Sequence, residues 1–204
     1  MGDARASFFH ANDFGPNGGY DDAVSNAELG VFRYTVPNSP ARRETLRRHD
    51  LHHVLTGYGA DWRGESEISA WELGSGIGPP SYAWVIALWG LFYGLFLTPA
   101  ATFVAFVRGR RSTNLYAEPD PDALLGEPVH RVAERLGVVA GPEAWSDMSA
   151  TQRAADVAAF MGWGATSMAW GAVAVVPTAA LVGAAALRSA ASAPCIFDRR
   201  ACGT

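Results

Sequence analysis

The chain has 204 residues, with 16 Lys and Arg against 20 Asp and Glu, which gives a net charge of -4 at pH 7. This length suits one domain with a substantial core. The negative charge argues against nucleic-acid binding, because that function needs a basic surface to neutralise phosphates. The two cysteines, Cys195 and Cys202, both lie near the C-terminus, so we expect neither a disulfide framework nor a cysteine-rich metal site.

The N-terminal part is rich in Gly, Asn, Pro and Asp, which favour turns. Residues 1–38 are therefore expected to form an irregular leader, with one extended piece at "VFRYTV".

A helical hairpin is predicted after the leader. Ser39 and Pro40 suit the cap and first turn of a helix, and Gly57 suits its end. Asp61 can cap a second helix directly afterwards. Residues 39–74 are therefore predicted to form two short antiparallel helices.

Residues 82–107 carry no charge and are followed by the basic run "RGRR". As one helix they would extend about 39 Å, more than the roughly 30 Å of bilayer hydrocarbon, so a membrane helix is predicted. Gly90 and Gly94 give this helix a face for close helix packing, and Pro99 predicts a kink. A buried core helix is the alternative.

The rest of the chain continues the helical pattern. A short helix is predicted within "EPVHRVAERLGV", which closes a helical domain over residues 39–138. Residues 139–188 form an additional apolar helical segment, opened by the capping-box pair Ser149 and Gln152. Pro177 would divide this segment into one span and a shorter partner or into a pair of tight turns, and periodicity does not decide between them.

The hairpin contains the stretch "RRHDLHHVLTGYGADWRGE", which holds three of the five histidines. Because successive helical residues lie about 100° apart, His49, Asp50 and His53 share one face. His52 falls on the far side of His49 from Asp50. In a tight hairpin, the second helix brings Glu65 to the height of His53. We therefore predict a metal site formed by His49, Asp50, His53 and Glu65.

Two imidazoles and two carboxylates suit zinc in a closed tetrahedral site, and iron, manganese or cobalt where positions stay open. The stretch also spells a desaturase histidine box, H-x-x-H-H, but a di-iron centre needs several boxes and only His10 and His130 remain. The zinc-protease pattern H-E-x-x-H is not matched either. Neither of these enzyme classes is therefore expected.

The fold class predicted is all-α: a helical bundle with a metal-binding hairpin and two or three strongly apolar membrane helices. Arginine is distributed almost evenly on the two sides of residues 82–107, so it does not set an orientation. We expect the metal site on the cytoplasmic side of a bacterial inner membrane or its equivalent, and a flexible tail over residues 189–204.

At the metal motif the sequence resembles the coenzyme Q biosynthesis protein four family, whose hallmark is H-D-x-x-H-x11-E. The quoted stretch is close to that family's usual "HDxxHVLTGxxTxxxGE". Downstream, "RGRRSTNLYAEPDPDALLGEPVHRVAERLGV" is similar to the family's basic stretch, connector and closing helix, so the resemblance covers about residues 34–138. The more apolar helix and the added C-terminal segment mark this chain as divergent.

The resemblance implies an all-helical, membrane-associated protein that binds a divalent metal, usually zinc, through the four motif residues. It implies a prenylated quinone precursor as ligand and a role in ubiquinone biosynthesis. That role is oxidative decarboxylation at ring carbon one or, alternatively, a non-catalytic scaffold that organises the biosynthetic enzymes, and a homo-oligomer is compatible with both. No catalytic residue is assigned.

For the lipid, which could be a membrane lipid or the quinone precursor, we single out six residues in the hairpin turn, the apolar helix and its basic end. Aromatic rings could line the isoprenoid tail, and arginines at the helix end could meet lipid phosphate. Core packing and interface anchoring would explain the same residues. The candidates are Tyr58, Trp84, Trp89, Arg108, Arg110 and Arg111.

Overall fold

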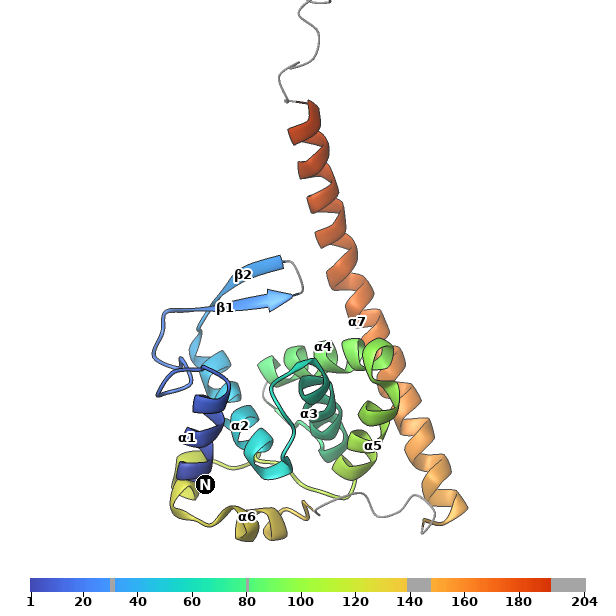
Figure 1. Ribbon diagram of the computed structural model, residues 1–204. Helices are drawn as coiled ribbons and strands as arrows, with labels where there is room; N and C mark the ends of the chain where they lie inside the picture. The colour runs from blue at the N-terminus through green and yellow to red at the C-terminus, as the bar shows by residue number, and fades with distance from the viewer. Residues whose placement is uncertain (30–31, 80, 139–147, 192–204) are drawn as a thin grey trace, which may run out of the picture.

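A helical body built around one central helix, α3, carries a small β-hairpin and a long C-terminal helix (Figure 1). The computed structural model describes residues 1–29, 32–79, 81–138 and 148–191. Within them the chain is mostly helical, as predicted, with one two-stranded sheet. In chain order the elements are α1 (Gly2–Ala11), β1 (Val24–Leu29), β2 (Phe32–Pro37), α2 (Pro40–Thr56), α3 (Trp62–Ser75), α4 (Ser81–Leu97), α5 (Pro99–Gly109), η1 (Pro121–Gly126), α6 (Val129–Arg135) and α7 (Ala150–Ala191).

The predicted helical hairpin is formed by α2 and α3. Ser39 caps α2 by accepting a hydrogen bond from the Arg42 backbone N–H at 3.2 Å. Gly57 ends α2 with a φ of 77°, a left-handed value that favours glycine. Asp61 caps α3 by accepting from the Gly64 N–H at 2.8 Å. The caps that the sequence predicted therefore define the turn that brings the two helices together.

Helix α3 is the centre of the core, with α4 and α5 packed along it (Figure 1). Its Ile68 and Trp71 side chains are fully buried, together with Leu91 of α4 and Phe106 of α5. Burying a side chain of this size contributes about 1.5–3 kcal/mol to stability. The largest apolar side chains of the core therefore hold α3 in place.

The small face predicted at Gly90 and Gly94 packs against α3. A β-carbon at Gly90 would lie 1.9 Å from Ser69 Oγ, and one at Gly94 would lie 3.0 Å from the Ser66 β-carbon. Any larger residue would therefore push α4 away from α3, because cores are packed without spare volume. The close packing that the sequence predicted is confirmed, and its partner is a helix of the same chain.

The prediction of one helix over residues 82–107 is wrong. α4 ends at Leu97 and α5 begins at Pro99, because proline has no N–H to continue the helix and its ring collides with the preceding turn. The 17 residues of α4 extend only about 26 Å. Within the described residues, no helix combines the length and the apolar character needed to cross a bilayer.

Helix α7 begins at the predicted capping box. Ser149 Oγ accepts from the Gln152 N–H at 3.2 Å, and Gln152 Oε1 accepts from the Ser149 N–H at 3.0 Å. The helix continues past Pro177, so neither of the divisions expected there occurs. Ser167 Oγ donates to the Leu88 carbonyl oxygen at 2.6 Å and ties α7 to α4.

The prediction of an irregular leader over residues 1–38 is wrong in part: β2 matches the extended piece expected at "VFRYTV", but α1 and β1 were not expected. The strands pair antiparallel, with Val24 opposite Pro37. The amine of Met1 donates to the Glu127 carbonyl oxygen and fixes the start of α1. A helix of 10 residues is marginal alone and depends on such tertiary contacts, which local sequence patterns do not report.

Two sequence predictions fall partly outside the described residues. Of the predicted tail, residues 189–191 belong to α7 and residues 192–204 are outside the description. Residues 139–147, at the start of the additional apolar segment, are outside it as well.

Candidate metal centre

Three side chains from the two arms of the hairpin converge. His49 and His53, one turn apart on α2, and Glu65, in the first turn of α3, each place a ligand atom within 4.8 Å of the others. His49 Nε2 lies 3.2 Å from His53 Nε2 and 3.4 Å from Glu65 Oε2, and His53 Nε2 lies 3.5 Å from Glu65 Oε1. Both histidines are buried, whereas 39% of the Glu65 side chain is exposed, so the cluster reaches solvent at Glu65.

Hydrogen bonds at the other ring nitrogen direct both imidazoles into the cluster. His49 Nδ1 lies 2.9 Å from Glu72 Oε1, and His53 Nδ1 lies 3.1 Å from the Tyr58 carbonyl oxygen. Both partners only accept hydrogen bonds, so in the neutral rings Nδ1 carries the proton and Nε2 presents a lone pair. This is the tautomer in which histidine binds a metal through Nε2.

Glu72 organises the base of the site from two turns further along α3. Its Oε1 accepts hydrogen bonds from His49 Nδ1, from His52 Nδ1 at 2.7 Å and from the Tyr116 hydroxyl at 2.9 Å. The side chain is fully buried, and its Oε2 has no hydrogen-bond partner within the described residues. A buried carboxylate needs a compensating positive charge, which a protonated His49 or a metal on that ring would provide.

The electrostatics of the cluster favour a proton on His49. Burial alone would lower the pKa of His49, but the charges of Glu72 and Glu65 raise it well above its usual value. Burial would raise the pKa of Glu65, yet hydrogen bonding and charge from His49 and His53 hold it at about 2. The pKa of Glu72 is likewise held below its usual range, against the effect of burial, by His49 and His52. A metal that enters the site would therefore displace the proton of His49.

The spacing of the three ligand atoms fits a metal ion. Zinc bound tetrahedrally at about 2.0–2.1 Å separates neighbouring ligand atoms by about 3.3–3.4 Å. The two imidazole nitrogens lie 3.2 Å apart, and each approaches a different oxygen of the Glu65 carboxylate, His49 Nε2 at 3.4 Å from Oε2 and His53 Nε2 at 3.5 Å from Oε1. Two imidazole nitrogens and a carboxylate oxygen also form a donor set that suits borderline divalent ions. The His49, His53 and Glu65 group could thus hold a metal ion.

The fourth predicted ligand, Asp50, is not brought into this group. Its Oδ2 accepts a hydrogen bond from the Tyr20 hydroxyl at 2.5 Å, and burial raises its pKa. His52, which helix geometry separated from the ligand set, bonds to Glu72 and accepts at Nε2 from the Leu115 N–H at 2.9 Å. It ties the base of the site to the connector before η1.

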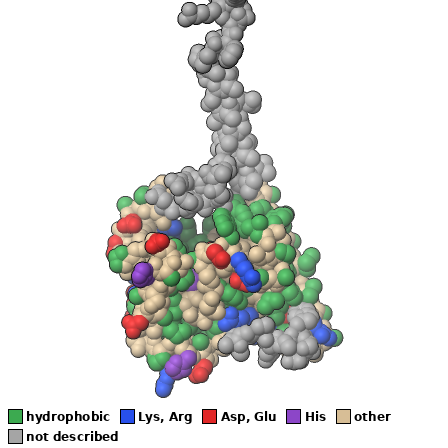
Figure 2. All heavy atoms as spheres, viewed as in Figure 1, with side chains coloured by type: hydrophobic (Ala, Val, Ile, Leu, Met, Phe, Trp, Pro, Cys, Tyr) green, Lys and Arg blue, Asp and Glu red, His purple; other side chains and the backbone are tan. Residues whose placement is uncertain are grey.

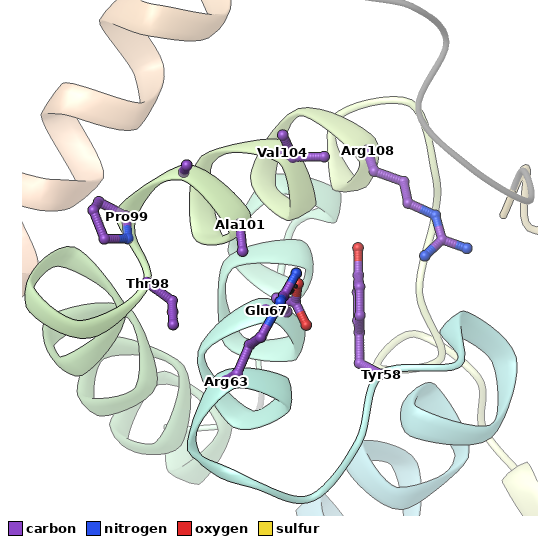
Figure 3. A pocket seen from close by; sticks show the side chains of 9 residues that line it. Tyr58, Arg63, Glu67, Thr98, Pro99, Ala101, Val104 and Arg108 are labelled. Atoms are coloured by element: carbon purple, nitrogen blue, oxygen red, sulfur yellow. Dashed lines mark hydrogen bonds and ion pairs between the residues drawn. The ribbon is translucent and has the colours of Figure 1, made fainter.

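A pocket of about 580 Å³ adjoins the hairpin turn, between α3 and α5 (Figure 3). Figure 3 shows Arg108 reaching towards the ring of Tyr58, and the guanidinium carbon lies 5.2 Å from the ring centre. Tyr58 connects the pocket to the metal centre, because its carbonyl oxygen holds His53. The lining consists of Tyr58, Arg63, Glu67, Thr98, Pro99, Ala100, Ala101, Val104 and Arg108.

The pocket and the metal ligands lie on opposite sides of α3. Arg63 and Glu67, which line the pocket, lie one turn apart and form an ion pair at 3.2 Å. Glu65 follows Arg63 by about 200° around the helix, so its carboxylate faces α2 instead. Of the residues that line the pocket, Tyr58 is bonded to a candidate metal ligand, through its carbonyl oxygen and His53 Nδ1.

Of the six residues proposed for lipid, the structure places only Tyr58 and Arg108 in this pocket. The two tryptophans pack elsewhere. Trp84 lies against Trp163 of α7, with ring centres 5.3 Å apart, and Trp89 stacks on its neighbour Tyr93 at 5.6 Å. Trp84 thus contributes to the packing of α7 on α4, which was the alternative stated for it, whereas the ring contacts of Trp89 lie within α4.

The two remaining arginines hold α7. Arg110 Nε and Arg111 Nη2 each donate to one oxygen of Asp156 at 2.7 Å. Asp156 is buried, so this double charge-assisted contact ties the start of α7 to the end of α5.

Sequence reasoning missed two residues of the site. Glu72 lies two turns after Glu65 and therefore on the same face of α3. The helical period alone could thus have predicted that Glu72 lies beside the site. Tyr20 reaches Asp50 from the leader, and no local pattern connects positions so far apart.

No family model matches this chain, and comparisons with curated proteins and with solved structures also find no match.

Proposed function

We propose that this protein binds a divalent metal, most simply zinc, and holds a prenylated quinone precursor for ubiquinone-type biosynthesis at a membrane. The observation that carries the metal is the buried group of His49, His53 and Glu65, whose ligand atoms all lie within 4.8 Å of one another. The quinone class comes from the resemblance of "HDLHHVLTGYGADWRGE" to the coenzyme Q biosynthesis protein four family. Iron, manganese or cobalt would suit the same donors if positions stay open.

The pocket beside Tyr58 supports the lipid part of the proposal. Its walls at Pro99, Ala101 and Val104 are apolar, and Arg108 stands at one end. An apolar pocket of this volume with a few polar groups suits a chain-like ligand that carries an oxygen-rich head. The isoprenoid tail of the precursor would lie along α5, and the aromatic ring of the precursor would lie near Tyr58.

Exposed apolar side chains support membrane association. Figure 2 shows hydrophobic side chains gathered on the right of the view, over α4, α5 and the lower part of α7. Isolated exposed apolar residues are ordinary, but a contiguous group marks an interaction surface. The large exposed hydrophobic residues of these three helices are Phe96, Leu97, Val104, Val157, Met161, Met168 and Val173.

Metal content tests the first part of the proposal. Wild-type protein purified in mild detergent should hold about one metal ion per chain, and Glu65→Gln should lose most of it because a neutral amide is a poor ligand. Glu67→Gln is the matched control, since Glu67 lies on the same helix but faces the pocket. Wild-type protein without bound metal, or equal loss in both variants, would contradict the metal claim.

Lipid extraction from the same preparations tests the second part. Wild-type protein should yield a prenylated aromatic lipid, and Ala101→Trp should abolish it by filling the pocket. Ala158→Trp, on the exposed face of α7, is the control for added bulk. Recovery of bulk phospholipid alone from wild-type protein would remove the quinone precursor from the proposal.

Catalysis is a second candidate, because three candidate ligands are grouped at His49, His53 and Glu65 in the described residues and catalytic zinc sites typically use three protein ligands. A metal bound there would supply Lewis-acid polarisation of a substrate oxygen. The reaction would be oxidative decarboxylation: the bond from the ring carbon to its carboxylate breaks, carbon dioxide leaves and a hydroxyl takes its place. Dioxygen would be the oxidant, and each of its two oxygen atoms would become the hydroxyl oxygen of one product ring. The position of the pocket, on the other side of α3 from Glu65, favours the alternative of a non-catalytic scaffold for the biosynthetic enzymes.

Carbon dioxide release separates these roles. A metal-loaded enzyme supplied with a prenylated ring carboxylate and dioxygen should release carbon dioxide, and Glu65→Gln should not. Stoichiometric lipid binding without turnover in the metal-loaded wild type would assign the scaffold role.

A further inference from the structure

The corner between α4 and α5 exposes large apolar side chains directly beside the pocket. Phe96 and Leu97, at the end of α4, are 62% and 59% exposed, and Val104 of α5 is exposed as well. Thr98 and Pro99 turn the chain between the two helices and line the pocket. Exposed apolar side chains that lie together mark a surface that another molecule covers. The corner is therefore a contact surface next to the pocket.

The pocket extends from this corner to the hairpin turn. Figure 3 shows Thr98 and Pro99 at one end of the pocket and Tyr58 and Arg108 at the other. Pro99 and Val104 line the pocket and are themselves exposed, so the apolar wall of the pocket continues onto the outer surface. A ligand with an apolar tail can therefore pass from the corner into the pocket along apolar side chains.

An aromatic pair lies beside the corner. Trp62 begins α3 and is exposed, and its ring lies edge-on to the ring of Tyr93 of α4, with centres 5.5 Å apart. Tyr93 precedes Leu97 by four residues, so these two side chains share one face of α4. Tryptophan and tyrosine are enriched where a protein meets the boundary between bilayer hydrocarbon and lipid headgroups. The pair therefore suits a corner that reaches into a bilayer.

The charges of the pocket suit a lipid surface with anionic headgroups. Among the lining residues, Arg63 and Arg108 provide two positive charges and Glu67 provides one negative charge. Arg63 follows Trp62 directly, and its side chain is exposed although it pairs with Glu67 at 3.2 Å. An arginine can lay its carbon stem on apolar surface while its guanidinium meets lipid phosphate. Arg63 therefore adds charge complementarity to the apolar and aromatic contacts.

We infer that the α4–α5 corner inserts into one leaflet of a membrane and opens the pocket to the hydrocarbon of that leaflet. Phe96 and Leu97 enter the hydrocarbon, Trp62 lies at the level of the headgroups and Arg63 meets lipid phosphate. A prenyl chain then passes sideways from the leaflet into the pocket, beside Pro99, without a step through water. The inference rests on the lipid binding and membrane association proposed above, and it adds the surface of insertion and the route of the lipid.

Vesicle binding tests the surface of insertion. The whole chain, freed of detergent, should bind vesicles of phosphatidylcholine, and Leu97→Gln should weaken this binding at least about tenfold, because the apolar area of an inserted leucine is lost. Val24→Gln is the matched control, since Val24 is 48% exposed but lies on β1. Phe96→Gln repeats the test from a second side chain of the corner. On vesicles that also contain phosphatidylglycerol, Arg63→Gln should bind about fivefold more weakly than wild type.

Transfer of retinol, a fluorescent prenyl alcohol, tests the route into the pocket. Wild-type protein should take up retinol from vesicles, and Leu97→Gln should do so at least about tenfold more slowly, because less of the protein is inserted at any time. Retinol added from ethanol should bind both proteins equally, since Leu97 does not line the pocket. Ala101→Trp, which fills the pocket, should bind retinol from neither source.

Three results would overturn the inference and leave lipid binding in place. They are equal vesicle binding by Leu97→Gln and wild-type protein, equal rates of retinol uptake from vesicles by these two proteins, and a wild-type dimer that Leu97→Gln dissociates. The dimer would show that a second copy of the chain covers the corner. Failure of wild-type protein to bind retinol from ethanol would instead contradict the lipid pocket of the proposed function, and the route with it. Failure of wild-type protein to bind any vesicle would contradict membrane association itself.

Discussion

Glu72→Gln should lower metal affinity about 10–100-fold, the usual cost of losing the residue that orients a metal-binding histidine. It should also destabilise the fold by about 3–5 kcal/mol, because the buried carboxylate that accepts from His49 and His52 is replaced by a neutral amide. If the glutamine side chain turns its NH₂ group towards His49 or His52, that group and the Nδ1–H of the ring are both donors, and no hydrogen bond forms. Metal competition titration and denaturant unfolding measure the two effects.

Tyr116→Phe is the matched control for Glu72. It removes one donor to the same Oε1 but leaves both imidazole contacts in place. The expected cost is about 1 kcal/mol, with metal affinity close to wild type. Equal losses of metal affinity in Tyr116→Phe and Glu72→Gln would refute an orienting role for Glu72.

Gly64→Ala should disrupt the hairpin turn. A β-carbon at Gly64 would lie 1.9 Å from the Gly59 carbonyl oxygen, a backbone atom that cannot turn aside as a side chain can. The turn must open to admit it, which should cost about 1–3 kcal/mol and displace Glu65 from the two histidines. Lower thermal stability and weaker metal binding should therefore appear together in one variant.

The comparison with Gly59→Ala isolates the steric cause. A β-carbon at Gly59 would approach only Asp61 Oδ1, at 3.5 Å, which is an ordinary contact. Gly59→Ala should leave stability within about 0.5 kcal/mol of wild type and metal affinity unchanged. Equal losses of stability and metal affinity in Gly64→Ala and Gly59→Ala would contradict the explanation that a β-carbon at Gly64 collides with the Gly59 backbone.

The hairpin and the three candidate metal ligands that it brings together could be predicted because their determinants are local. Ser39, Gly57 and Asp61 define helix ends through capping within a few residues, and helical period places His49 and His53 on one face. Glu65 follows from the short turn between the two helices. A site whose geometry depends on caps and period alone can be read from a sequence.

The remaining features depend on tertiary contacts. The helical period placed Asp50 on the ligand face, but its carboxylate accepts a hydrogen bond from Tyr20, 30 residues earlier in the chain. Composition indicated an apolar helix over residues 82–107, whereas the break at Pro99 lets α4 and α5 cover two sides of α3. Hydrophobicity alone does not distinguish a helix that faces lipid from one that packs on a neighbour.

X-ray absorption at the edge of the metal bound to the purified wild-type protein tests the central claim most directly. The geometry predicts nitrogen and oxygen neighbours at about 2.0–2.1 Å with the outer scattering of two imidazole rings, from His49 and His53. Sulfur neighbours at about 2.3 Å would place the metal at Cys195 or Cys202 and contradict the site described here. A spectrum without imidazole scattering would contradict it equally.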